Sequence, residues 1–196
     1  MNHNLRMILF VFILGGITSV LLVGVNLITR DRIIANQEIK LRSTILNAND
    51  VNFTLNTIND IFEDRIDVIT VDETYIFYHD TQSGNISFRF EGGGVWGPII
   101  GIITLASDFE TIVDISILQQ EETPGLGGVV AERWYLDQYT GVIMIPELLV
   151  VKSADAPNEA DAITGATRTS NAFQGILNTD YQNHKTAWES LNGGSN

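Results

Sequence analysis

The hydrophobic pattern of the chain begins with one long apolar run. Residues 7–29 carry no charge between Arg6 and Arg30 and consist largely of Ile, Leu, Val and Phe. About 20 apolar residues span a bilayer as a helix, so this run predicts a retained single-span anchor. A buried core helix is the alternative. A signal peptide would have a shorter apolar run followed by a small-residue cleavage site.

Short stretches rich in β-branched and aromatic residues dominate the middle of the chain. Turn-forming residues such as Ser83-Gly84-Asn85 and Ala106-Ser107-Asp108 separate them and are typical of hairpins. Strands are therefore expected at residues 67–71, 74–79, 86–91, 99–105, 111–118 and 148–151. Hairpin-linked strands with few helices predict an α+β domain built on an antiparallel sheet with flanking helices.

Helical spacing is expected in three further segments. Residues 31–48 continue the anchor helix, with apolar positions on one face. A short helix is expected at residues 129–137, and a C-terminal helix begins at about Asn171, with a break near Asn178. The expected organisation is an anchor (1–32), a helical and loop connection (33–60), one domain (61–191) and a disordered tail (192–196).

Charge and composition exclude several classes of function. The chain has a net charge of −13, and beyond Arg32 its 8 basic and 23 acidic residues leave a balance of −15. Such an acidic surface disfavours nucleic acid and anionic lipid headgroups. The absence of Cys excludes disulfides, thiolate catalysis and iron–sulfur ligation by this chain. The three histidines lie far apart and lack the spacing of a metal site, and no catalytic residue is expected.

Two glycine-rich stretches lie in the middle of the chain. Residues 92–97 match G-x-G-x-x-G, but Pro98 and a β-rich run follow instead of the helix that a dinucleotide site requires. Residues 121–128 contain Pro124-Gly125, which is typical of a type II turn, and Gly127-Gly128, where the backbone can lie flat against a planar ligand. Each stretch is either a structural turn or a ligand contact.

The most distinctive stretch is residues 161–170, Asp-Ala-Ile-Thr-Gly-Ala-Thr-Arg-Thr-Ser. It reads as a turn that leads into a helix, with Thr169, Ser170 and Asn171 as candidate N-caps. Free N–H groups and the positive end of the helix dipole would face Thr167. The physical pattern alone indicates a possible anion site, although most capped helix starts bind nothing.

These motifs resemble a known family of FMN-binding proteins. Asp161-x-x-Thr164-Gly165-Ala166-Thr167 is similar to its flavinylation motif, and Glu-Thr-Pro-Gly-Leu-Gly at 122–127 is similar to a second signature. The family contains the NqrC component of the sodium-translocating NADH:quinone reductase and the RnfG component of the Rnf complex. Gly94-Val95-Trp96-Gly97-Pro98 resembles a segment of the former, while the motif residues and the short length resemble the latter. The quinone reductase type is slightly favoured.

The resemblance implies covalent FMN, bound as a phosphoester to Thr167 and attached by a separate flavin transferase. It further implies cofactor contacts from residues of all three motifs and from one strand end: Thr164, Gly165, Ala166, Thr123, Gly125, Leu126, Gly127, Trp96 and Lys152. Leu126 would cover the isoalloxazine ring, and Lys152 would contact phosphate or a flavin carbonyl. Asp161 would shape the motif turn or bind the metal of the transferase. Solvent exposure is expected for Arg168.

The implied function is that of an electron-carrier subunit in an ion-translocating respiratory complex, without independent catalysis. Electrons would pass between partner subunits of the complex. The resemblance places the protein in the bacterial inner membrane, with residues 7–29 in lipid and the soluble domain in the periplasm. Four basic residues follow the anchor and one precedes it, so the positive-inside rule predicts the opposite orientation. The alternative function is a membrane-anchored binding or scaffold module without a redox cofactor.

Overall fold

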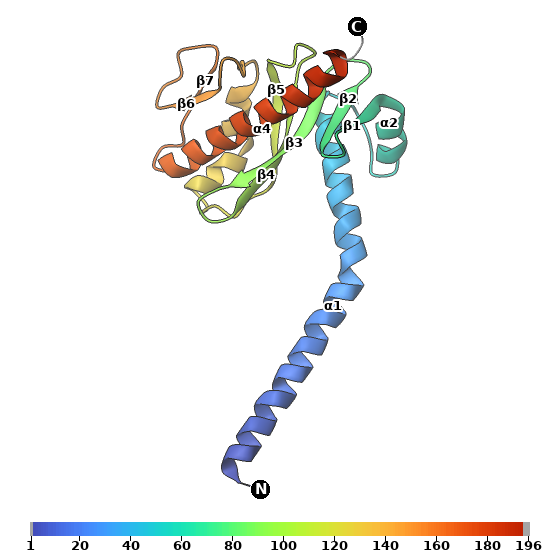
Figure 1. Ribbon diagram of the computed structural model, residues 1–196, viewed down its shortest axis with the longest axis vertical. Helices are drawn as coiled ribbons and strands as arrows, with labels where there is room; N and C mark the ends of the chain where they lie inside the picture. The colour runs from blue at the N-terminus through green and yellow to red at the C-terminus, as the bar shows by residue number, and fades with distance from the viewer. Residues whose placement is uncertain (1, 194–196) are drawn as a thin grey trace. The chain divides into compact units, whose positions relative to one another are not determined.

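The computed structural model describes residues 2–193, and the chain divides into two compact units, Met1–Lys40 and Leu41–Asn196 (Figure 1). The first unit is formed by most of helix α1 (His3–Ala48), and the second contains a sheet and the other helices. The chain therefore has an N-terminal apolar helix and an antiparallel sheet with flanking helices. The α+β fold expected from the sequence is confirmed.

Helix α1 in the first unit is long and apolar enough to cross a membrane. The 18 residues of its most apolar stretch are not buried against protein. Thr18 and Thr29 donate their hydroxyl protons to carbonyl oxygens four residues earlier, over 2.9 and 2.8 Å. A hydroxyl that is bonded within its own helix leaves no polar group unsatisfied in lipid. The helix continues to Ala48, as the spacing of residues 31–48 predicts.

Five strands form one antiparallel sheet in which each strand pairs with the next along the chain. They are β1 (Ile66–Val71), β2 (Tyr75–Asp80), β3 (Ile86–Gly93), β4 (Pro98–Leu105) and β5 (Ile112–Gln119). Each end lies within two residues of the predicted one. Phe77, Phe88, Ile103 and Ile115 are successive register partners across β2 to β5, and all four are buried. This row forms the centre of the main hydrophobic core.

Helix α4 (Thr167–Gly193) packs on the core face of the sheet (Figure 1). Phe173, Leu177 and Tyr181 recur every four residues and are fully or almost fully buried. The ring of Phe173 meets Phe90 of β3 edge to face, with 6.0 Å between the ring centroids. A stripe with this spacing is what an amphipathic helix buries against a sheet.

Two expectations for this helix were wrong. It begins at Thr167 instead of Asn171, because the Ser170 N–H already donates to the Ala166 carbonyl over 3.0 Å. It also continues through Asn178, whose side chain exchanges two hydrogen bonds with the Leu148 backbone instead of competing with the helix. The helix extends to Gly193, and the last three residues of the predicted disordered tail lie outside the described residues.

The segment between β5 and α4 consists of short elements. The helix expected at 129–137 is divided into η1 (Gly127–Ala131), α3 (Arg133–Leu136) and η2 (Asp137–Tyr139). Strands β6 (Leu149–Val151) and β7 (Glu159–Asp161) pair in parallel, and β6 lies in the stretch predicted as strand-like. These elements lead the chain back to the start of α4.

The opposite face of the sheet carries a smaller buried region. Ser87 and Thr104 are register partners on this face and share a 2.8 Å hydrogen bond between their hydroxyls. Phe62 of α2 (Ile58–Arg65) meets Tyr78 edge to face at 6.2 Å between ring centroids. Ile45, in the last turn of α1, is also fully buried. The end of α1 is therefore part of the folded domain.

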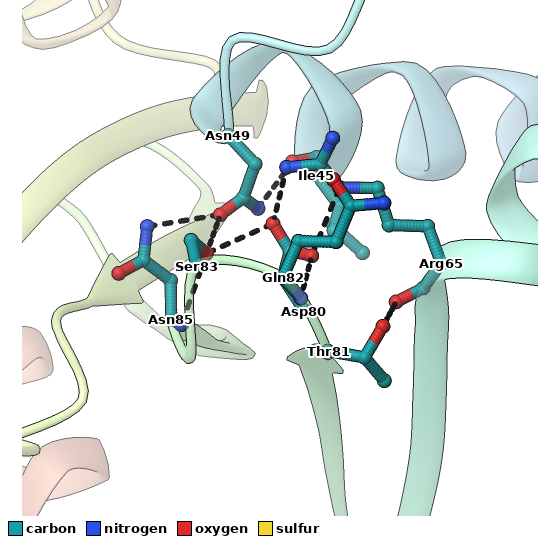
Figure 2. Close-up of polar contacts among 8 residues, drawn as sticks. All are labelled: Ile45, Asn49, Arg65, Asp80, Thr81, Gln82, Ser83 and Asn85. Atoms are coloured by element: carbon teal, nitrogen blue, oxygen red, sulfur yellow. Dashed lines mark hydrogen bonds and ion pairs between the residues drawn. The ribbon is translucent and has the colours of Figure 1, made fainter.

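A polar network joins the end of α1 to the β2–β3 turn (Figure 2). Asn49 accepts a hydrogen bond from the Asn85 side chain at 2.9 Å, and its amide oxygen lies 3.0 Å from the Ser83 hydroxyl. Asp80, which is fully buried, receives both Nε and Nη2 of Arg65 at 2.9 and 2.8 Å. Burial opposes ionisation of Asp80, but the hydrogen bonds from Arg65, Gln82 N–H and Ser83 outweigh it and lower its pKa.

Candidate functional site: a cavity at the start of helix α4

A cavity of about 270 Å³ lies where the glycine–tryptophan turn before β4, the loop after β5 and the start of α4 meet. Its lining residues are Val95, Trp96, Glu122, Thr123, Leu126, Gly127, Gly165, Ala166, Thr167, Arg168 and Thr169. The volume is slightly below the range of about 300–1,000 Å³ that is typical of small-molecule sites. A ligand of nucleotide size would therefore lie partly outside the cavity.

Trp96 and Leu126 give the cavity its apolar surface. Their side chains are 71% and 47% exposed, although both belong to residue types that usually avoid water. Trp96 follows a turn closed by the Gly94 N–H and the Gly97 carbonyl at 2.8 Å. An aromatic and an aliphatic side chain exposed beside one cavity provide a surface on which a planar apolar ring can lie.

The loop after β5 presents Leu126 by means of a tight turn. The Leu126 N–H donates to the Thr123 carbonyl over 3.1 Å, and Gly125 has a φ of 73°. A positive φ at this position is the property of a type II turn, as Pro124-Gly125 predicts. The Gly128 N–H also donates to the Thr123 carbonyl, over 2.9 Å. Both ends of the turn are thereby fixed beside the cavity.

The start of α4 supplies the polar part of the cavity. Gly165, with a φ of 82°, reverses the chain immediately before the helix. The N–H groups of the first helical turn have no acceptor within the helix and carry the positive end of its dipole. Thr167 and Arg168 are both exposed, and both line the cavity. This end of the cavity is suited to an anion such as a phosphate.

Glu122 forms one wall of the cavity, and the sequence analysis missed it. The acidic residues were expected on the surface, but Glu122 is only 5% exposed. One carboxylate oxygen accepts hydrogen bonds from the N–H groups of Val95 (2.7 Å) and Trp96 (3.1 Å), and the other accepts from the Thr169 hydroxyl (2.7 Å). The position of this acid inside the signature stretch was the signal that could have identified it.

The structure brings most of the residues implied by the three motifs to one place. Trp96, Thr123, Leu126, Gly127, Gly165, Ala166 and Thr167 all line the cavity. Thr164, Gly125 and Lys152 are exposed and lie outside its lining. Asp161 accepts a 2.7 Å hydrogen bond from the Ala154 N–H, so it holds the chain before the motif turn. Arg168 is exposed, as expected, but also lines the cavity.

The fold and the cavity define an FMN-binding domain: residues 94–182, which contain every lining residue, match the family model described as FMN-binding domain. The curated relatives are NqrC proteins of the Na(+)-translocating NADH-quinone reductase. That of Yersinia pestis is 28% identical, with 70% of this chain and 54% of the relative covered. That of Pasteurella multocida is 34% identical, with 50% and 41% covered. The resemblance inferred from the motifs is confirmed.

Solved structures share the fold. The crystal structure of Shewanella oneidensis NqrC has a TM-score of 0.67 at 21% identity, with 75% of this chain and 93% of that chain covered. The corresponding protein from Parabacteroides distasonis has a TM-score of 0.62 at 21% identity, with 76% and 92% covered. The chain spans about half the length of the first curated relatives that it matches.

The cavity also fits FMN by its chemistry. FMN combines a planar isoalloxazine ring with a phosphate. The exposed side chains of Trp96 and Leu126 offer apolar surface for the ring. Helix N–H groups and the Arg168 side chain are available for the phosphate. These donors, together with the FMN-binding domain match, support FMN as the ligand of this domain.

Proposed function

We propose that the protein is a membrane-anchored electron carrier that holds FMN covalently through the Thr167 hydroxyl. The observation that carries the proposal is the position of Thr167 as the first residue of α4, exposed and inside the lining of the cavity. Attachment would replace the hydroxyl proton by the phosphoryl group of the flavin. The resulting diester keeps one negative charge, which the helix N-terminus and Arg168 would stabilise.

The other hydroxyl groups of the motif are less suitable for attachment. Thr169 is buried and donates its proton to Glu122. Ser170 is fully buried, donates to the Ala166 carbonyl at 3.1 Å and accepts from the Ile163 N–H at 3.0 Å. Thr164 is exposed but lies outside the lining of the cavity. Among these four hydroxyl groups, Thr167 alone combines exposure with a place in the cavity.

Bound FMN would supply the redox chemistry, since no side chain of this domain exchanges electrons at accessible potentials. The chain's own residues would bind the ring, hold the phosphate and keep the cofactor in place permanently. Electrons would arrive from and leave to other subunits of a membrane complex. The names of the curated relatives favour a sodium-translocating NADH:quinone reductase over an Rnf complex.

Helix α1 would hold the domain beside these partner subunits. Confinement to the same membrane raises the effective concentration of one protein for another. We propose an extracytoplasmic position for the domain, where the flavin transferase would act, although the basic residues after the apolar run favour the opposite orientation. Protease protection of sealed spheroplasts would distinguish the two: digestion of the domain from outside supports the proposal, and protection contradicts it.

The test of attachment is expression of the full chain with a flavin transferase, followed by denaturing electrophoresis and peptide mass mapping. Wild-type protein is expected to fluoresce in the gel and to carry one FMN, less one water, on Thr167. Thr167→Ala should lose the adduct, and Thr167→Ser should keep it. Thr164→Ala is the matched control and should remain modified. A wild-type protein of unmodified mass would overturn the proposal and leave a binding or scaffold module.

A further inference from the structure

We infer that Glu122 is a positioning residue of the flavin site, through which the segments that receive the cofactor are held together before attachment. The inference rests on the proposed function and deepens it. The Glu122 carboxylate joins the turn at Val95 and Trp96 to Thr169 in the first turn of α4. These groups lie 27, 26 and 47 residues from it along the chain.

The surrounding glycines leave room only for this carboxylate. A Cβ at Gly94 would lie 2.5 Å from Glu122 Oε1, and a Cβ at Gly127 would lie 2.5 Å from Thr169 Oγ1 and would also overlap Glu122 Oε2. Neither glycine has a positive φ. These two motif glycines are therefore required for close approach and not for backbone conformation. The loop and the turn close directly on the carboxylate.

The charge of Glu122 is compensated without a cation. Among the ion pairs of the described residues none involves Glu122, and its hydrogen bonds come from two N–H groups and one hydroxyl. Removing a carboxylate from water without a paired charge costs free energy, so such a group is a poor device for stability alone. Its place in the cavity wall points to a role in the site.

The position of Thr167 follows from this arrangement. Successive residues of an α-helix are rotated by about 100° around its axis. Thr169 is held against Glu122 inside the protein, whereas Thr167, two residues earlier, is exposed in the cavity. Fixing Thr169 therefore fixes the rotation of the first helical turn. Without Glu122, the Thr167 hydroxyl and the Trp96 turn would lose their defined relation to each other.

Two substitutions separate geometry from charge. In Glu122→Gln, the amide oxygen can still accept from the Val95 and Trp96 N–H groups, and the amide NH₂ can donate to the Thr169 oxygen. This variant removes the charge and keeps the connections. Glu122→Ala removes both. The neighbouring Glu121, which is exposed, provides the matched controls Glu121→Gln and Glu121→Ala.

The experiment measures the initial rate of flavin attachment to the full chain in membranes, at limiting transferase, by intact mass. Glu122→Ala should attach flavin about tenfold more slowly or worse, because a small displacement of a reacting group costs this much. Glu122→Gln should stay within about twofold of wild type. Hydrogen exchange at Val95 and Trp96 should accelerate in Glu122→Ala before any flavin is bound. The Glu121 variants should match wild type in both measurements.

The outcomes separate this inference from the proposed function. An unmodified wild-type chain overturns the proposed function, and the exchange rates of Val95 and Trp96 still test the connections. If attachment to Glu122→Ala is as fast as to wild type, the inference fails while the proposed function stands. If Glu122→Gln is as slow as Glu122→Ala, the charge and not the geometry is needed, and the inference fails. Should Glu122→Ala not fold, Thr169→Val decides: attachment slowed about threefold supports the inference, and an unchanged rate overturns it.

Discussion

Two buried carboxylates, Asp80 and Glu122, hold distant segments of this domain together in different ways. Asp80 is fully buried and receives two hydrogen bonds from the Arg65 guanidinium (Figure 2). Glu122 is 5% exposed and receives two backbone N–H groups and the Thr169 hydroxyl. Asp80 lies away from the cavity, whereas Glu122 lines it.

The difference indicates what each acid contributes. A bidentate guanidinium compensates the charge of a buried carboxylate and makes the pair a stable connection. Hydrogen bonds from neutral groups compensate it less completely, so the arrangement around Glu122 contributes less to stability and can be retained for its place in the site. Substitutions at Asp80 and its partners should therefore affect folding, and substitutions around Glu122 should affect attachment of the cofactor.

The largest effect is expected when Arg65 is replaced by Met. The fully buried Asp80 would then keep only neutral donors, as Glu122 does in the wild type. Loss of one partner of a buried pair destabilises by about 3–5 kcal/mol, and urea unfolding of the detergent-solubilised chain would measure it. Replacing Asp80 by Asn in the same chain should recover much of the loss. A loss below about 1 kcal/mol would contradict the structural role of the guanidinium.

Acid should weaken the same connection. The pKa of Asp80 is lowered in the folded state, so its contribution to stability is fully present above the pKa of the unfolded chain. That contribution is lost as the pH falls below about 4 and through the folded-state pKa. The free energy of unfolding of wild type should therefore decline more steeply below about pH 4 than that of Arg65→Met. Parallel pH profiles for the two proteins would contradict the assignment.

The strands could be predicted from the sequence because their apolar side chains alternate and the turns between them are marked by Gly, Asn, Asp and Ser. The start of α4 was placed four residues late, because Thr169 and Ser170 resemble caps when their partners are unknown. Those partners, Glu122 and the Ile163 N–H, are set by tertiary structure and by the preceding turn. Local pattern determined the elements but not the connections between them.

The candidate site shows the same division. Trp96, Leu126 and Thr167 could be selected from motifs, because each lies in a short stretch with its own signature. The burial of Glu122 could not, because an acidic chain offers 24 Asp and Glu residues and no local pattern separates a buried one from the rest. The same holds for Asn49, whose partners Ser83 and Asn85 follow 34 and 36 residues later.

A smaller effect is expected when a methyl group is placed against Glu122 without changing the acid. In Gly94→Ala the new Cβ would lie 2.5 Å from Glu122 Oε1 and 2.8 Å from the Gly97 carbonyl oxygen, which is fixed by the turn hydrogen bond. Such overpacking costs about 1–3 kcal/mol, and flavin attachment should slow as well. Gly93→Ala is the control, since its Cβ would meet nothing within 4 Å. Equal behaviour of the two variants would exclude close packing around the carboxylate.

The smallest effects come from removing one hydroxyl at each carboxylate, and this pair separates the two regions most sharply. Ser83→Ala removes the 2.8 Å contact to Asp80, and Thr169→Val removes the 2.7 Å hydrogen bond to Glu122. Each should cost about 1 kcal/mol in urea unfolding, the usual contribution of one hydrogen bond. Flavin attachment should stay at the wild-type rate in Ser83→Ala and slow in Thr169→Val. If both variants attach flavin at the same rate, the distinction between a folding carboxylate and a site carboxylate does not hold.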